Sequence, residues 1–118
     1  MQVIINIPDQ VIIDSISTAL EGGSNYWYYL PNLKMLKYPD EDSLAANIFQ
    51  TAMEGIEIPV EDIETNELLG HIIKESIERG IQLYIDNGNR LPTDDDPLDA
   101  EEADIFLQYI VLGEIVYG

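Results

Sequence analysis

Few side chains in this 118-residue sequence are suited to catalysis, because it contains one histidine, His71, and no cysteine. Without cysteine there is no thiol nucleophile, disulfide or zinc–cysteine site, and one histidine cannot build a multi-histidine metal site. None of the serines lies in the Gly-x-Ser-x-Gly pattern of a hydrolase nucleophile. We therefore expect a protein that is not an enzyme and that uses no cofactor.

Carboxylates are the other groups that could do chemistry, and Asp94, Asp95, Asp96 and Asp99 form one such cluster. Ca²⁺ and Mg²⁺ are hard cations that bind carboxylate oxygens. The cluster lacks both the Asp-x-Asp-x-Asp-Gly spacing of a calcium loop and the glutamate at its twelfth position. We interpret it as an acidic loop that leads into a helix N-terminus, where negative charge is favourable, and we expect no metal site.

Four consecutive aromatic residues, Tyr26 to Tyr29, form a second candidate site. Aromatic rings stack on nucleobases with about 1–3 kcal/mol per base. A nucleotide-type ligand would be held by Asn25, Tyr26 and Trp27 together with Arg79 or Arg90, at the interface of a homo-oligomer. Tyrosine and tryptophan are also the commonest anchors of protein interfaces, so packing in the core or in an oligomer interface is the favoured interpretation, and ligand binding is the alternative.

The distribution of charge is the most informative feature. The chain carries 23 acidic and 5 basic residues, for a net charge of −18. Nine acids lie between Asp40 and Glu67 and seven between Asp94 and Asp104, and neither segment contains a base. A domain of this size has a radius of gyration of roughly 13–14 Å and spans about 35 Å, over which duplex DNA carries on the order of 20 phosphates. The negative charge density of this protein is therefore comparable to that of duplex DNA.

This charge repels nucleic acid and anionic lipid, so we expect neither as a direct ligand. The expected partner is a basic protein that itself binds nucleic acid. No signal-peptide pattern is present, and no apolar run approaches the roughly 20 residues of a membrane helix, which predicts an intracellular protein. The residues predicted to contact the partner are Asp40, Glu41, Asp42, Glu57, Glu61, Asp62, Asp94, Asp95, Asp96, Asp99, Glu101 and Glu102.

The elements that must position these side chains follow from apolar spacing. Helices are predicted over residues 9–21, 43–54, 66–86 and 100–112. The third would be the longest and would carry His71, and the fourth starts with a capping box of Asp99 and Glu102. Short strands are predicted over residues 3–7, 26–29, 33–38, 56–63 and 114–117, the last of which could pair with the first.

The segment 56–63 contains Pro59, which is typical of an edge strand or a hairpin arm. Several helices and a few short strands without a βαβ rhythm predict an α+β fold. We expect a single domain over residues 1–118, with three to four helices packed on a small mixed or antiparallel sheet.

Several segments resemble a group of small phage and prophage accessory proteins. The resemblance rests on Glu21–Trp27, which reads EGGSNYW, on residues 99–104, and on the C-terminal GEIVYG of residues 113–118. Residues 77–88 also resemble that group's long helix, whereas residues 30–65 do not match it. The resemblance implies a phage accessory protein in the cytoplasm of a bacterial host and no residue-by-residue activity. Small acidic phage proteins often inhibit host defence, so the resemblance favours that role by association.

Two functional hypotheses follow. The first is an acidic phage-type protein that inhibits a host nucleic-acid-handling defence protein, such as a CRISPR or restriction nuclease, by binding its basic surface, with DNA mimicry as one mode. The alternative is an anti-defence protein that sequesters a nucleotide-type signalling molecule in an aromatic pocket.

Overall fold

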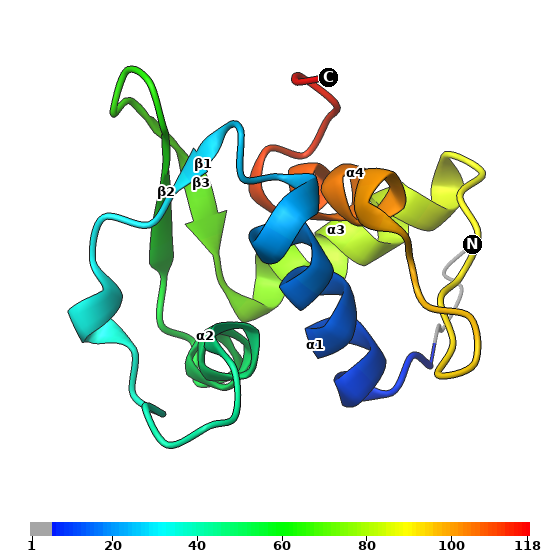
Figure 1. The fold of residues 1–118 in the computed structure, drawn as a ribbon, viewed down its shortest axis with the longest axis horizontal. Helices are drawn as coiled ribbons and strands as arrows, with labels where there is room; N and C mark the ends of the chain where they lie inside the picture. The colour runs from blue at the N-terminus through cyan, green and yellow to red at the C-terminus, as the bar shows by residue number, and fades with distance from the viewer. Residues whose placement is uncertain (1–5) are drawn as a thin grey trace.

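The computed structural model describes residues 6–118, in which four α-helices pack on a three-stranded antiparallel sheet (Figure 1). This architecture confirms the predicted α+β fold. The buried hydrophobic residues form one core cluster. In chain order the elements are α1 (Asp9–Thr18), the π-helical turn η1 (Ala19–Gly23), β1 (Tyr28–Tyr29), the 3₁₀ turn η2 (Leu33–Met35), α2 (Leu44–Met53), β2 (Ile58–Asp62), β3 (Leu68–Ile72), α3 (Lys74–Asp86) and α4 (Ala100–Val111).

The helix ends follow the signals in the sequence. The Ser43 hydroxyl accepts a hydrogen bond from the Ala46 N–H at the start of α2. The predicted capping box forms at the start of α4, where the Asp99 and Glu102 side chains each accept from the other's backbone N–H. These bonds satisfy N–H groups that a helix start otherwise leaves unpaired. Three helices are followed by a glycine in the left-handed region, where other residues are strained: Gly55, Gly88 and Gly113.

Helix α4 lies at the centre of the fold and contacts α1, α3 and β3. Phe106 and Ile110 of this helix are fully buried. Gly80 of α3 lies so close to the Ile110 backbone that a side chain there would clash. Gly23 at the end of η1 approaches the Ala100 carbonyl oxygen with the same consequence. The fourth helix, which carries part of the second acidic segment, is therefore held tightly in place.

Strand β2 is the central strand of the sheet. Ile58 and Ile72 are paired across β2 and β3 and are buried, so this face of the sheet covers the core. Strand β1 pairs only with Glu61 and Asp62, so within the described residues no strand lies beside Pro59 on the β1 side, whereas on the other side Pro59 pairs with His71 of β3. Proline, which has no N–H to donate, is tolerated at such an open side. The hairpin-arm interpretation of residues 56–63 is confirmed and the edge-strand interpretation is wrong.

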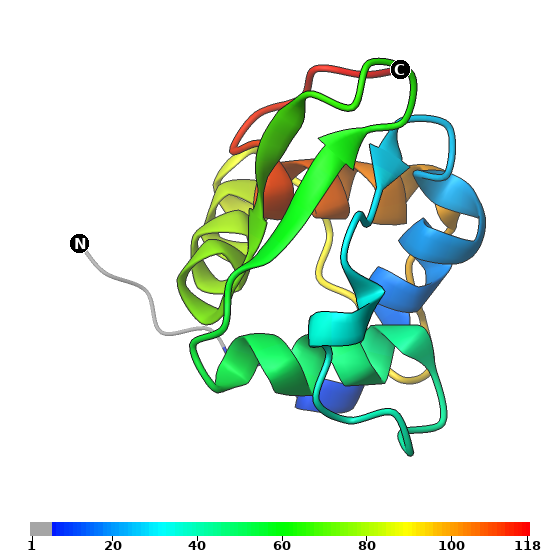
Figure 2. The same ribbon diagram turned by 90° about the vertical axis from the view of Figure 1, so that its left-hand side faces the viewer.

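The other face of the sheet is not covered by a helix of the described chain. In Figure 2 this face is turned toward the viewer, and α3 and α4 lie behind the hairpin of β2 and β3. Antiparallel sheets commonly leave one face in water, with polar side chains on it. The outward-pointing residues of β2 are therefore available to a partner.

The predicted helix over residues 66–86 is wrong in its first part, which forms β3 instead. Asn66 adopts a left-handed φ of +60° in the turn between β2 and β3. The apolar residues that follow fit strand alternation as well as helical spacing, and pairing with β2 decides between the two. The correction places His71 on β3, where its Nε2 lies 4.0 Å from Glu57. At 13 residues, α3 is still the longest helix in residues 6–118, as predicted.

Two further strand predictions are wrong, and one lies mostly beyond the described chain. Residues 33–38 contain the turn η2, which is closed by hydrogen bonds from Met35 and Leu36 N–H. Residues 114–117 form no strand, because the buried Gln108 side chain takes their backbone groups. In the predicted strand over residues 3–7, residues 3–5 lie outside the described residues, and residues 6 and 7 are not in a strand.

Candidate interaction surface

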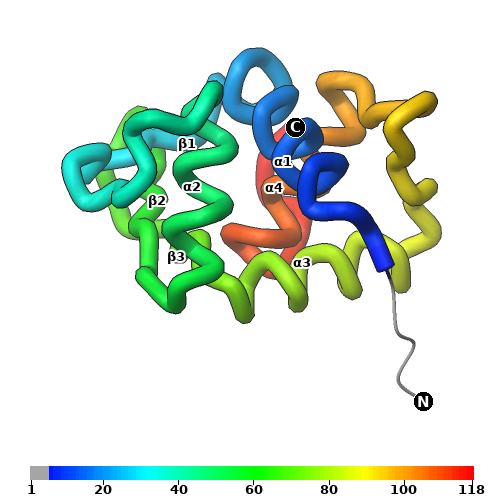
Figure 3. The backbone as a smooth tube through the Cα atoms, turned by 90° about the horizontal axis from the view of Figure 1, so that it is seen from below, coloured from blue at the N-terminus to red at the C-terminus, as the bar shows by residue number. Residues whose placement is uncertain are grey.

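The two acidic segments lie at opposite ends of the molecule. The longest extent is 35 Å and the radius of gyration is 13.2 Å, both as expected from the chain length. Figures 1 and 3 both place the sheet and α2 at one end and the loop before α4 at the other. We call residues 40–67 the hairpin end and residues 89–104 the α4 end. The residues predicted to contact a partner are therefore divided between two separate regions.

The hairpin end carries exposed carboxylates without compensating bases. Within residues 6–118, no lysine or arginine forms an ion pair with any of its nine acids. Glu57 has a neighbour in His71, but that pair is charged only when the imidazole is protonated. The predicted contact residues here are exposed or half-buried: Asp40, Glu41, Asp42, Glu57, Glu61 and Asp62. Uncompensated carboxylates on one end of a small protein create a strong negative potential there.

Asp62 is the exception at this end, because its carboxylate holds the fold together. Its Oδ1 accepts hydrogen bonds from the backbone N–H groups of Glu64 and Thr65, at 2.8 and 3.0 Å. Its Oδ2 accepts from the Tyr117 hydroxyl at 2.7 Å. The hydrogen bond from Tyr117, followed by those from the backbone, lowers the pKa of Asp62. The hydrogen bond to Asp62, followed by burial, raises the pKa of Tyr117 to about 12.

The α4 end is different because a base from outside the acidic segment folds back onto it. The Arg90 guanidinium donates two hydrogen bonds to the Glu102 carboxylate, both 2.8 Å long. The same group lies 3.2 Å from the Asp96 carboxylate and donates to the carbonyls of Asp96 and Pro97. The expectation that this segment is unneutralised is therefore wrong.

Glu102 shows the effect of this pairing on protonation. The hydrogen bond from Arg90, followed by that from the Asp99 N–H, lowers the pKa of Glu102. The Asp99 carboxylate accepts from the Glu102 N–H and completes the capping box. Asp94, Asp95 and Glu101 remain exposed and outside any ion pair in the described chain.

Asp104 is the last acid of the second segment, and it is buried. Its Oδ1 accepts from the Ser24 hydroxyl at 2.7 Å and from the Trp27 indole N–H at 2.8 Å. Its Oδ2 accepts from the Tyr26 hydroxyl at 2.7 Å. Burial, followed by the hydrogen bond to Asp104, raises the pKa of Tyr26 to about 12. This carboxylate therefore joins α4 to the segment before β1.

The role of Asp104 could have been found in the sequence. It precedes Leu107 by three residues and Val111 by seven, so it shares their apolar stripe on α4. A charged residue on a buried stripe requires hydrogen-bond donors, and aromatic side chains with polar tips can supply them. From charge alone, Asp104 is expected at the surface with the other acids of its segment.

The aromatic cluster divides into buried and exposed members. Trp27 is 1% exposed, and its ring stacks on Tyr117 with centroids 5.2 Å apart and planes 7° apart. The Tyr28 hydroxyl donates to the Leu20 carbonyl at 2.7 Å. Tyr26 and Tyr29 are close to half exposed. Trp27 thus packs in the core, with its N–H bound to Asp104 and one ring face covered by Tyr117.

The residues predicted to hold a nucleotide do not converge in the described structure. Arg79 donates to the Ile110 carbonyl near the end of α4, whereas Trp27 binds Asp104 near its start. Six helical residues separate these two positions by about 9 Å along the axis. Arg90 is bound to the acidic loop, and Asn25 is exposed. No shared pocket of these five side chains results.

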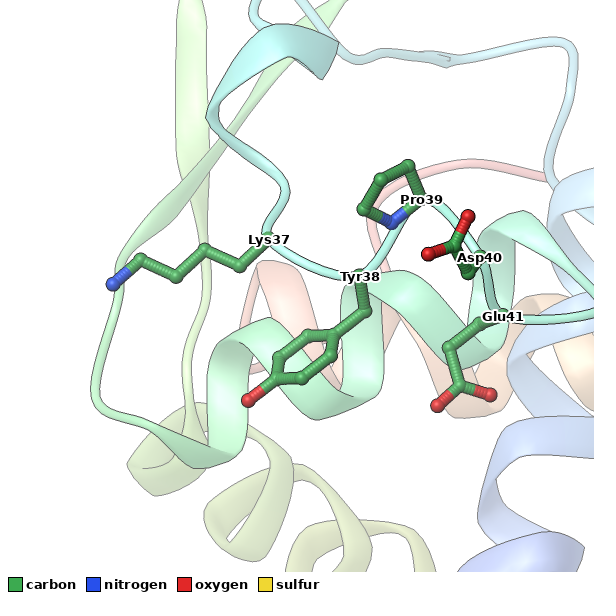
Figure 4. A pocket seen from close by; sticks show the side chains of 5 residues that line it. All are labelled: Lys37, Tyr38, Pro39, Asp40 and Glu41. Carbon is green, nitrogen blue, oxygen red and sulfur yellow. The ribbon is translucent and has the colours of Figure 1, made fainter.

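A small open cavity of about 240 Å³ lies at the hairpin end and is lined by Lys37, Tyr38, Pro39, Asp40 and Glu41 (Figure 4). The Tyr38 N–H is held by the Asn47 side chain at 2.8 Å. In Figure 4 the Lys37 amine extends away from the two carboxylates and does not neutralise them. The cavity is smaller than the roughly 300–1,000 Å³ typical of small-molecule sites.

In residues 6–118, no three histidine or carboxylate side chains gather in a way that would hold a metal ion. None of the helices in that range combines the length and apolar character needed to cross a membrane. Comparison of the chain with protein-family models, with curated proteins and with solved structures finds no match. The hairpin end is the candidate site, because its carboxylates are exposed and have no lysine or arginine partner within the described chain.

Proposed function

We propose that the protein is an inhibitor that binds the basic surface of a protein that handles nucleic acid. The observation that carries this proposal is the set of exposed carboxylates at the hairpin end, with no lysine or arginine paired to them in residues 6–118. Carboxylates held on the hairpin of β2 and β3 and on the loop before α2 present their charge together at one end of the molecule. Such an array steers a basic protein toward it and disfavours partners of like charge.

The inhibitor acts by competition. A basic groove that accepts the hairpin end releases its own counterions and loses access to phosphates, so binding weakens steeply with salt. The α4 end contributes less, because Arg90 already compensates Glu102 and Asp96. The contact surface we propose is therefore Asp40, Glu41, Asp42, Glu57 and Glu61, with Glu64 and Glu67 of the hairpin turn.

The resemblance to phage accessory proteins supports a host defence protein, such as a CRISPR or restriction nuclease, as the target in the bacterial cytoplasm. The sequestration of a nucleotide-type signal has no comparable support. Trp27 is stacked on Tyr117, and both arginines bind groups of their own chain.

A pull-down from bacterial lysate with the tagged protein tests this proposal. We expect the wild-type protein to retain a nucleic-acid-binding protein at low salt and to release it at high salt or on addition of duplex DNA. Mass spectrometry identifies the retained protein. A triple variant, Glu57→Gln, Glu64→Gln and Glu67→Gln, should lose the retention.

The matched control is Asp94→Asn, Asp95→Asn and Glu101→Gln, which removes the same charge from exposed positions at the α4 end. This variant should retain the partner. Retention that resists salt and DNA, or loss in both variants to the same degree, would contradict the proposed contact surface.

A further inference from the structure

Exposed apolar side chains lie among the carboxylates on the outward face of the sheet. The strand register pairs Tyr29 with Glu61, and Glu61 with Leu68. Directly opposed residues of antiparallel strands point to the same face. These three side chains therefore form one row across the sheet, in which Tyr29 is 45% and Leu68 59% exposed.

The same face continues along β2. Alternation places Pro59 and Glu61 outward, whereas Ile58 and Val60 are buried in the core. Glu57 comes directly before the strand, Ile63 comes directly after it in the turn to β3, and both are exposed. Ile63 is 45% exposed. Figure 2 shows this face of the sheet toward the viewer with no helix in front of it. We call Tyr29, Glu57, Glu61, Ile63 and Leu68 the outer sheet face.

This composition differs from that of a simple charge array. A surface that only imitated phosphates would gain nothing from exposed leucine, isoleucine and tyrosine side chains, which cost free energy in water. Interface centres, by contrast, are enriched in aromatic and apolar anchors with polar groups at the rim. The apolar groups point to a protein segment as the occupant.

We propose that the outer sheet face docks a short segment of the partner protein in which lysine or arginine residues lie between apolar residues. Charge complementarity determines this choice, because Glu57 and Glu61 on the face would pair with the cations. Leu68 and Ile63 would be covered by the apolar residues, and the Tyr29 ring offers a cation–π contact. A second copy of this chain would bring like charges together. The inference rests on the proposed function and specifies the chemistry of its partner.

Two peptides of equal charge test the docking. Each is about ten residues long, which spans roughly 33 Å when extended. In one, lysine alternates with leucine, and in the other with serine. We expect fluorescence anisotropy to show about tenfold tighter binding of the lysine–leucine peptide to the wild-type protein. Amide NMR shifts caused by that peptide should map to β1, β2 and β3.

The double variant Tyr29→Ala and Leu68→Ser should lose this preference and bind the lysine–serine peptide as the wild type does. Leu91→Ser is the matched control, because Leu91 is 46% exposed and lies at the α4 end. It should keep the preference. Circular dichroism checks that each variant is folded.

Equal affinity of the wild type for both peptides would overturn the docking inference and leave the electrostatic function standing. Failure to bind either peptide at low salt would overturn both. Self-association that disappears in the double variant would show that a second copy covers this face, and would also overturn the inference.

Discussion

The hairpin end and the α4 end have nearly the same acidic character in the sequence, but they use their carboxylates differently. At the α4 end, Arg90 pairs with Glu102 and Asp96, Asp99 caps the helix, and Asp104 is buried under three hydrogen bonds. At the hairpin end Asp62 is bound in this way, and Glu61 accepts one long hydrogen bond from the Asn66 side chain. Most carboxylates of the hairpin end are exposed to solvent, whereas most carboxylates of the α4 end stabilise the fold.

A run of acidic residues in a sequence does not show how many of its carboxylates are uncompensated in the folded protein, because that number depends on residues outside the run. Arg90 lies outside the run it neutralises, and the donors to Asp104 lie 77 to 80 residues away in the chain. Removing acids from the two ends should therefore have opposite consequences. Loss of the bound acids at the α4 end should affect stability, and loss of the exposed acids at the hairpin end should affect binding.

The largest effect is expected for Asp104→Ala. The change leaves the buried Ser24 hydroxyl and Trp27 N–H without an acceptor, and should lower the free energy of unfolding by about 3–5 kcal/mol. Urea unfolding followed by circular dichroism measures it. The control, Asp95→Ala, removes an exposed carboxylate from the same end and should change stability by less than about 0.5 kcal/mol. Similar effects of the two variants would remove the distinction between buried and exposed acids at this end.

A smaller effect is expected for Glu102→Gln, which weakens the contact with Arg90 and the capping box. At pH 7 the variant should lose about 1 kcal/mol of stability. The folded pKa of Glu102 lies below its ordinary 4.5, so the contribution of Glu102 to stability is present above pH 4.5 and is lost as the pH falls from there through the lower folded pKa. The wild type should therefore lose more stability than the variant on acidification.

Thermal unfolding of both proteins across the acid range measures this difference. Glu101→Gln is the control, since Glu101 is exposed on the same helical turn and lies outside the pairing. An identical acid profile for Glu102→Gln and wild type would show that the Arg90 contact contributes nothing in solution.

Much of the fold follows from local signals in the sequence. Ser43, the Asp99–Glu102 box and the glycines after three helices act within a few residues, and the ends of α2 and α4 are where these signals place them. The segment 66–73 is different, because its apolar residues fit two periods and only its pairing with β2 selects the strand. The β3 strand thus depends on a contact that no local pattern contains.

The candidate site was predictable only in part. The exposed acids of the hairpin end were identified from charge alone, and none of the predicted contact residues is buried. The burial of Trp27 was not identified, because it depends on Tyr117, which lies 90 positions further along the chain. The neutralisation by Arg90 also depends on how the loop folds. Charge can be counted from a sequence, but its compensation is set by tertiary structure.

The Tyr117→Phe variant tests the one structural carboxylate of the hairpin end. Loss of the hydroxyl removes the strongest cause of the lowered pKa of Asp62, which should rise toward its ordinary 3.8. An NMR titration of the side-chain carboxyl measures it. The hydrogen bond from Tyr117 to Asp62 also makes the stability of the wild type depend on pH. Because the folded pKa of Tyr117 is raised from 10.0 to about 12, the contribution of this bond should be lost as the pH rises from 10 toward 12.

The control for this experiment is Tyr29→Phe, since the Tyr29 ring lies on the outward face of the sheet, away from Asp62. It should leave the pKa of Asp62 unchanged. If Tyr117→Phe also left it unchanged, the C-terminal residues would not be tied to the hairpin through this carboxylate.

The smallest effect on stability is expected for the triple variant Glu57→Gln, Glu64→Gln and Glu67→Gln. These side chains are exposed and have no lysine or arginine partner in residues 6–118. Their removal relieves repulsion within a chain of net charge −18, so the free energy of unfolding should rise slightly, by less than about 0.5 kcal/mol. Urea unfolding at low and high salt measures it, and the gain should shrink as salt screens the repulsion. A loss of stability would mean that the hairpin end, like the α4 end, uses its acids to hold the fold, and the contrast between the two regions would then disappear.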